Sequence, residues 1–202
     1  MGDYSFDITK SCTLLPLNQE IISLDFSCGD EDLDDFFHNH ALPYAKEHLG
    51  KTYVLLSNDT QRSEIVAFFT VSNDSIKTTF IPKSSTNKVQ RKVPGLKHLR
   101  TYPAVLIGRL GVNKSYQGKG LKVGRQIVNY IKLWFLDEDN KTGCRFLVVD
   151  AYNKPEVLAF YEFNGFKYLY ATEEAEKEAT QISSEGLHTR FMFLDLLHTS
   201  II

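Results

Sequence analysis

Apolar and polar positions follow one another along this chain in patterns that predict strands and helices in succession, without an internal repeat. Nearly continuous or alternating apolar runs, which are typical of strands, occupy 52–57, 65–71, 104–110 and 188–196. Apolar residues recur at helical spacing over 123–134, and an acidic first turn followed by an apolar stripe predicts a helix from residue 30. This mixture predicts an α/β fold.

Weaker patterns complete the expected order of elements. Segments 12–17 and 21–26 are extended candidates, Pro43 is expected to interrupt the preceding helix, and 173–180 is a short charged helix. Polar residues and prolines predict a long, flexible excursion over 75–102, of the kind that is often functional in compact domains.

Composition and charge are those of an ordinary folded protein. A length of 202 residues, 43% of them hydrophobic, is expected to form one domain over 1–202. A net charge of −2 gives no strong electrostatic field that would attract nucleic acid or an anionic membrane. Cys12, Cys28 and Cys144 form no C-x-x-C pair, which disfavours disulfides and structural zinc and fits a reducing compartment. Without a leader or an apolar run of roughly 20 residues, the protein is expected to be cytoplasmic, with no membrane partner.

A glycine-containing turn joins the strand at 104–110 to the helix at 123–134. Glycines in Gln117-Gly118-Lys119-Gly120 let the backbone approach a ligand, and the first amides of the helix attract an anion. Lys122 and Arg125 add positive charge, although such residues also form ordinary solvated helix faces. The turn therefore predicts a phosphate site.

Two common phosphate loops do not fit this turn. A Walker loop counted from Gly111 finds Tyr116 at its second glycine, and a dinucleotide fingerprint from Gly118 finds Val123 at its third. The remaining pattern, Gln-x-x-Gly-x-Gly/Ala, matches at Gln117 and Gly120, with Lys122 in the last position. It resembles the pyrophosphate loop of the GCN5-related N-acetyltransferases (GNAT family), which bind acetyl-coenzyme A.

A second segment, RFLVVDAYNKPEVLAFYEFNGF at 145–166, resembles the same family's second motif, a strand followed by a short helix. By that resemblance Tyr161 is the catalytic acid that protonates the departing coenzyme A thiolate, and Asn153 is a cofactor contact. The residues themselves also fit a core aromatic at Tyr161, between Phe160 and Phe163, and a helix cap at Asn153.

The resemblance implies a mixed, mostly antiparallel central sheet, split at the cofactor cleft, with helices on both faces. It places the cofactor core at about 104–166, with acetyl-coenzyme A as co-substrate. The backbone of Leu110, Gly111 and Val112 would hold the pantetheine arm, and the pyrophosphate would lie on Gln117, Gly118, Lys119, Gly120, Leu121 and Lys122. No general base is identified. We expect no metal, because His38, His40 and His48 lack a one-face helical spacing.

The resemblance also narrows the reaction. FSCGDEDLDDFF, GKTYVLL, VLIGRLGVNKSYQGKG and AFYEFNGF resemble, in this order, the acetyltransferase toxins of toxin–antitoxin modules and their free-standing relatives. Those toxins acetylate the amino group of an aminoacyl-tRNA, and they imply a homodimer and an antitoxin partner. Since tRNA binding depends on basic residues, the slightly acidic chain favours an N-acetyltransferase of small primary amines, with the tRNA toxin as the alternative.

Two further hypotheses follow from the residue types. A tRNA acceptor would need a local basic surface, for which the candidates are Lys83, Lys88, Arg91, Lys92, Lys97 and Arg100. Because Lys122 replaces a small residue in the loop, a rival class is a module that binds acetyl-coenzyme A without turnover.

Overall fold

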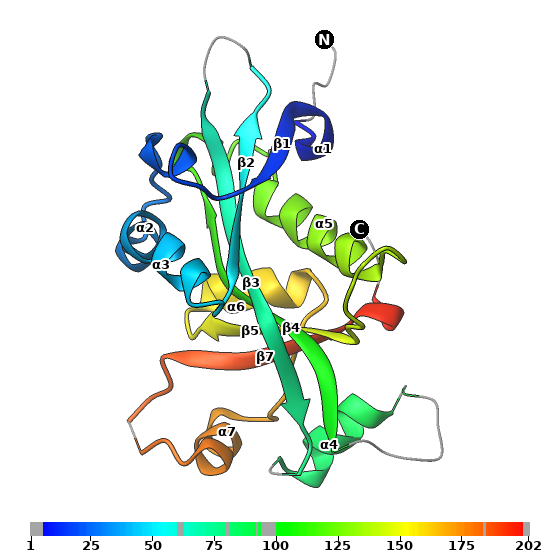
Figure 1. The fold of residues 1–202 in the computed structure, drawn as a ribbon. Helices are drawn as coiled ribbons and strands as arrows, with labels where there is room; N and C mark the ends of the chain where they lie inside the picture. Colours follow the sequence, from blue (N-terminus) through cyan, green and yellow to red (C-terminus); the bar gives the residue numbers. More distant parts are fainter. Residues whose placement is uncertain are drawn as a thin grey trace. The chain divides into compact units, whose positions relative to one another are not determined.

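The computed structural model is a mixed α/β structure with seven strands (Figure 1) in the order β1-β2-β3-β4-β5-β7-β6. It describes residues 6–59, 63–79, 81–91, 93, 100–183 and 185–199. The pairs β1–β2, β2–β3, β5–β7 and β6–β7 are antiparallel, whereas β4 and β5 are parallel from Ala104↔Phe146 to Leu106↔Val148. The predicted mixed, mostly antiparallel α/β fold is confirmed.

The chain divides into two compact units, 1–72 with 107–131 and 73–106 with 132–202. The first unit holds α1 (Ile8–Ser11), β1 (Cys12–Pro16), η1 (Ile21–Ser23), α2 (Glu31–Asp35), η2 (Phe36–His40), α3 (Ala41–Lys46), β2 (Lys51–Ser57) and η3 (Lys114–Tyr116). The second holds α4 (Lys83–Gln90), β5 (Phe146–Tyr152), α6 (Pro155–Phe163), β6 (Lys167–Tyr168), α7 (Glu173–Thr180), β7 (Thr189–Asp195) and η4 (Leu196–His198). Three elements contribute residues to both units: β3 (Ile65–Lys77), β4 (Thr101–Val112) and α5 (Val123–Leu136).

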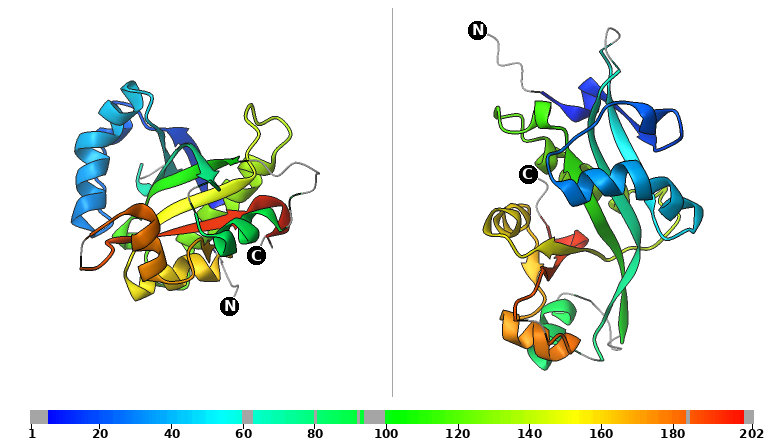
Figure 2. Two further views of the ribbon diagram at one scale, coloured as in Figure 1. Left: turned by 90° about the horizontal axis from the view of Figure 1, so that it is seen from below. Right: turned by 90° about the vertical axis from the view of Figure 1, so that its left-hand side faces the viewer.

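The core of the first unit is aromatic. Phe26, Phe37 and Phe68 form a cluster with ring centroids 4.8 to 5.4 Å apart. Phe37 lies in the π-helical segment η2, and Figure 2 shows α2, η2 and α3 following one another as one helical run. This arrangement fixes the helical run against β2 and β3 through buried rings.

The core of the second unit joins α4 to the strands of that unit. Val89 of α4 packs with Phe146 of β5, Phe193 of β7 and the buried segment at Leu169 and Tyr170. These residues are nearly inaccessible, so α4 belongs to this core despite its polar sequence.

Several boundaries differ from those expected from the sequence. Segment 21–26 begins with a 3₁₀ turn rather than a strand, and Pro43 lies inside α3. This helix directly follows the π-helical segment η2, where the backbone hydrogen bonds depart from the α-helical pattern that a proline would interrupt. The polar segment 75–102 contains the end of β3, helix α4 and the start of β4. The sequence of α4 shows no periodic apolar pattern, because this helix buries only Ser85 and Val89.

Candidate cofactor and catalytic residues

The last residues of β4 are the part of the candidate site predicted to hold the pantetheine arm. Gly111 is buried, while Leu110 and Val112 are half-buried. A Cβ at Gly111 would lie 2.5 Å from Cε1 of Phe68, a distance that side chains do not tolerate. The glycine is therefore required by the close approach of β3, whatever β4 binds.

The turn after η3 has an unusual backbone. Gly118 and Gly120 have φ of 65° and 70°, and Lys119 and Lys122 also have positive φ, at 42° and 54°. Left-handed backbone is costly for residues other than glycine and persists where the surrounding structure imposes it. Consecutive amides in such turns form concave sites that suit anions.

Several amides of this turn are available to a ligand. In the described part of the chain, no protein acceptor is found for the backbone N–H groups of Gly118, Lys119, Gly120, Lys122, Val123 and Gly124. Near the start of α5, the amide of Gln126 donates to the carbonyl of Lys122. The start of a helix with unused amides and neighbouring lysines is a physical basis for binding a phosphate.

Gln117 holds the turn in place. Its Nε2 donates to the carbonyl of Cys28 and to the carbonyl of Val112, both at 2.7 Å. With both amide hydrogens used in this way, Gln117 connects the end of β4 to a segment 89 residues earlier in the chain. The sequence pattern identified Gln117 but carried no signal for Cys28 as its partner.

Asp34 of α2 orders the segment that receives Gln117. Its carboxylate accepts hydrogen bonds from the Cys28 amide at 2.7 Å and from Ser27 Oγ at 2.7 Å. Burial acts to raise the pKa of Asp34, but these hydrogen bonds outweigh it and lower that pKa below 3.8. Asp34 is therefore ionised and orders the turn indirectly, through Cys28, which contacts Gln117. The sequence patterns did not identify this role of Asp34.

Tyr161 lies in α6 and is 9% exposed. Its ring contacts Phe160 and Phe166, with centroids 5.1 and 5.3 Å away, whereas the neighbour expected from the sequence, Phe163, is 62% exposed. Burial raises the pKa of Tyr161 to about 12. Within the described residues its hydroxyl has no hydrogen-bond partner, so a protonated phenol is available as a donor.

Asn153 does not cap α6, contrary to the interpretation as a helix cap. The N-cap is Lys154, and Asn153 Nδ2 donates instead to Glu173 Oε2 at 3.1 Å and to the carbonyl of Leu187 at 3.0 Å. The amide thus connects the end of β5 to α7 and to the segment before β7. Of the Asn153 side chain, only Oδ1 remains for a contact with the cofactor. That contact stays a prediction.

Two of the three histidines considered as metal ligands have separate partners. His38 Nε2 contacts the carbonyl of Phe26 at 2.9 Å, and His40 Nε2 lies 3.1 Å from Asp35. Among the described residues, no group of three or more His, Cys, Asp or Glu side chains is placed to hold a metal. In the same part of the chain, every helix is too short or too polar to cross a bilayer.

No family model matches the chain. The solved structures that the fold matches include those of KacT and AtaT. A mutant of KacT is 23% identical, with 90% of this chain and 94% of that chain covered and a TM-score of 0.64. AtaT in complex with acetyl-methionyl-tRNA is 22% identical, with 91% and 94% covered and a TM-score of 0.61. The chain has the fold of these proteins.

A third structure, AtaTR bound with acetyl-coenzyme A, is 19% identical, with 93% of this chain and 95% of that chain covered and a TM-score of 0.61. Another AtaT structure is described as a mutant toxin bound to the C-terminus of the antitoxin AtaR and acetyl-coenzyme A. The GNAT-type fold predicted from the two motifs is thus confirmed.

Proposed function

We propose that this protein is an acetyl-coenzyme A-dependent N-acetyltransferase that acts on a primary amine. The observation that carries the proposal is the left-handed turn at 118–122, where unused amides and glycines precede α5. Coenzyme A carries a pyrophosphate, and such a turn suits that group. The matching fold of AtaTR bound with acetyl-coenzyme A supports the same cofactor.

In the proposed reaction, each half of the candidate site has a separate task. The backbone of Leu110, Gly111 and Val112 holds the pantetheine arm, and Gln117, Gly118, Lys119, Gly120, Leu121 and Lys122 hold the pyrophosphate. Asn153 supplies an additional cofactor contact through Oδ1. Acetyl-coenzyme A brings an activated acyl group whose thiolate leaves more easily once it is protonated.

Tyr161 is the proposed donor of that proton. The amine nitrogen attacks the acetyl carbonyl, a C–N bond forms, the C–S bond breaks, and the thiolate takes the proton of the Tyr161 hydroxyl. The proton that the amine loses passes to solvent and restores Tyr161, so the balance is one amide and one free thiol. Because the Tyr161 pKa is raised to about 12, the phenol remains protonated at neutral pH, as a general acid must.

The acceptor is proposed as a small primary amine, with the amino group of an aminoacyl-tRNA as the second candidate. The second candidate is favoured by one observation, the similar fold of AtaT in complex with acetyl-methionyl-tRNA. A net charge of −2 favours the first, because RNA binding needs basic residues. A toxin would also have an antitoxin partner.

We also propose that the protein forms a homodimer. Sedimentation that gives only a monomer at micromolar concentration would exclude this.

Thiol release from acetyl-coenzyme A tests the proposal directly. The protein is incubated with a panel of primary amines and, separately, with charged and uncharged tRNA, and both thiol and acetylated product are measured. Acetylated aminoacyl-tRNA, together with growth arrest on expression, would place tRNA first. Turnover of free amines with inert tRNA would support the small-amine acceptor.

The rival class, a module that binds acetyl-coenzyme A without using it, predicts a different outcome. Coenzyme A would bind, but no acceptor would raise thiol release above the rate without protein. That result, obtained with both amines and aminoacyl-tRNA, would reject the proposed acetyltransferase activity. It would leave the proposed coenzyme A site at the turn intact.

A further inference from the structure

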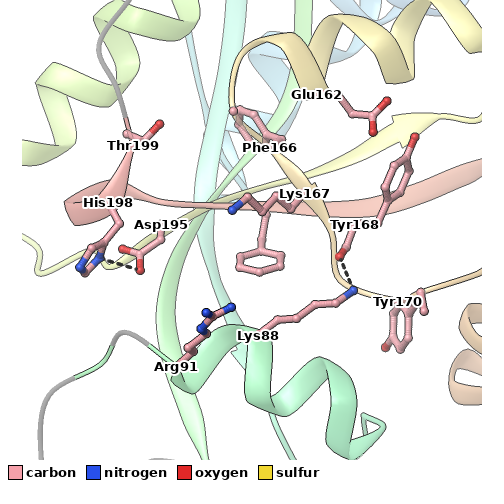
Figure 3. Close-up of a pocket in the computed structure, with 13 residues that line it drawn as sticks. Lys88, Arg91, Glu162, Phe166, Lys167, Tyr168, Tyr170, Asp195, His198 and Thr199 are labelled. Atoms are coloured by element: carbon pink, nitrogen blue, oxygen red, sulfur yellow. Dashed lines mark hydrogen bonds and ion pairs between the residues drawn. The ribbon is translucent and has the colours of Figure 1, made fainter.

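The unit formed by 73–106 and 132–202 contains a pocket of about 570 Å³ that the proposed reaction does not use. Its walls come from α4, the end of α6, β6 and the end of β7 (Figure 3). A volume of this size is within the range of small-ligand sites, roughly 300–1,000 Å³.

The walls of the pocket are fixed by contacts between α4 and the segment after β6. Ser85 is 1% exposed, and its Oγ donates to the carbonyl of Leu169 at 2.6 Å. Lys88 Nζ donates to the carbonyls of Tyr168 and Leu169 at 3.2 and 3.4 Å. Since Val89 is also buried in the core, the pocket is built on a packed framework rather than on a surface loop.

Three cations from two elements face this space. Figure 3 shows Lys88 of α4, Arg91 at the C-cap of α4 and Lys167 of β6 lining the same pocket, with the Lys88 ammonium at the Tyr168 carbonyl. Arg91 and Lys167 are exposed, and within the described ranges none of the three has a carboxylate at salt-bridge distance. Their charge is therefore not balanced by the protein.

The two acids of the pocket have other partners. Asp195 Oδ2 is 2.9 Å from Arg145 Nη2 and 3.1 Å from His198 Nδ1. The pKa of Tyr168 is raised, first by burial and then by the charge and hydrogen bond of Glu162, so that carboxylate acts on the tyrosine. Asp195 is thus neutralised by Arg145, and Glu162 is the one acid of the pocket without a cationic partner among the residues that the structure describes. Lys88, Arg91 and Lys167 therefore leave the pocket with a positive net charge.

We propose that this pocket binds the phosphate group of a nucleotide, either a free mononucleotide or a unit of an RNA strand. Arginine presents a planar pair of donors that matches phosphate oxygens, and Lys167 adds a charge from the opposite element. The volume exceeds that of a phosphate ion, and Tyr168 and Phe193 provide aromatic wall for the rest of the nucleotide. The site does not depend on acetyl transfer.

Isothermal titration of the full chain with AMP and with a short single-stranded RNA tests this site. All proteins in this test carry Gly120→Val, which is expected to weaken phosphate binding at the turn at 118–122, so that AMP does not occupy that turn. A separate titration of the unsubstituted chain with coenzyme A reports on the turn. The test variant is Arg91→Gln/Lys167→Gln. The matched control is Lys77→Gln/Lys141→Gln, which removes the same charge from exposed residues of the same unit outside the pocket.

We expect the test variant to weaken binding by about tenfold or more per removed cation, because each makes a charge-assisted hydrogen bond. The control should keep the parent affinity. Binding of AMP alone identifies a free nucleotide as the ligand, and binding of RNA alone identifies a strand; either supports the site. The proposal is overturned if neither probe binds the parent, if the test variant binds as tightly as the parent, or if the control loses as much.

Discussion

At the scale of single residues, the turn at 118–122 combines open space with strained backbone. Among the described residues, a Cβ at Gly118 or Gly120 would meet nothing within 4 Å, yet both residues have positive φ, as do Lys119 and Lys122. The described residues thus leave space beside the two glycines. We propose that the pyrophosphate approaches the turn through this space.

Gly120→Val should weaken coenzyme A binding sharply while the protein stays folded. The side chain would occupy the space where a pyrophosphate approaches, and the positive φ adds a cost of about 1–3 kcal/mol. Gly143→Val is the control, since a Cβ there also meets nothing within 4 Å and no positive φ is involved. Calorimetric titration gives the affinity for coenzyme A. If the two folded variants bind it equally tightly, the pyrophosphate does not bind at this turn.

Tyr161→Phe should keep the fold and the cofactor affinity but lower kcat, because it removes one hydroxyl and leaves the ring in its aromatic contacts. General acids contribute about a hundredfold to ten-thousandfold. Tyr102→Phe is the matched control, since Tyr102 is another buried tyrosine whose hydroxyl has no hydrogen-bond partner among the described residues. Single-turnover rates that match the parent's would make Tyr161 a packing residue.

The pH profile provides a second measure of the same residue. Burial raises the Tyr161 pKa to about 12, so its proton is retained well above the usual pKa of 10. Any fall of kcat at mildly alkaline pH therefore comes from another group.

At the scale of elements, the turn depends on a segment that lies far away in the sequence. Asp34 fixes Ser27 and Cys28, and Cys28 receives Gln117. A strand end, a loop and a helix start are thus held together by side-chain amide and carboxylate groups rather than by sheet pairing. Gly29, with φ of 86°, allows the chain to turn between Cys28 and α2.

Asp34→Asn should lower the free energy of unfolding near neutral pH by about 1–2 kcal/mol, the range for hydrogen bonds to a partly exposed charged group. Because the folded-state pKa is lowered, the carboxylate's contribution is complete above its unfolded value of 3.8 and is lost as pH falls through the folded value. The variant should therefore lose less stability on acidification than the parent.

Urea unfolding at several pH values measures this difference. Glu31→Gln, an exposed acid in the first turn of the same helix, is the control and should follow the parent. A pH dependence of Asp34→Asn that is as steep as the parent's would contradict the role of Asp34.

Strong apolar patterns were enough to predict the presence of β2, β3, β4, α5 and β7, because such patterns are set by burial alone. The helix α4 was missed, since a polar sequence that buries two residues has no periodic signal. The contact of Gln117 with Cys28 was equally invisible, because both acceptors are backbone carbonyls, which every residue carries. The left-handed φ of Lys122 is likewise imposed by the turn and not by the lysine.

At the scale of the whole molecule, a net charge of −2 means that any affinity for RNA must come from local cations. Four of the six proposed basic residues are described, Lys83, Lys88, Arg91 and Arg100; Lys92 and Lys97 lie outside the described residues. Lys167, which no sequence pattern associated with them, faces the same pocket as Lys88 and Arg91.

If aminoacyl-tRNA is the acceptor, its affinity should fall steeply as salt concentration rises, because phosphate contacts release counterions. Neutralising Lys83, Lys88, Arg91 and Arg100 together should flatten the slope of log Kd against log salt. Turnover of a small amine should depend little on salt in either protein. A tRNA affinity that is insensitive to salt in the parent would exclude this surface as a phosphate contact.

The close approach of Gly111 to Phe68 has a consequence for how this protein can change over generations. A larger residue at position 111 is excluded while the Phe68 ring is in place, and shrinking Phe68 first leaves a cavity beside Phe26 and Phe37. Each single step is damaging, although the two together preserve the packed volume. The two positions should therefore behave as an epistatic pair, and paired libraries would reach variants there that stepwise selection does not.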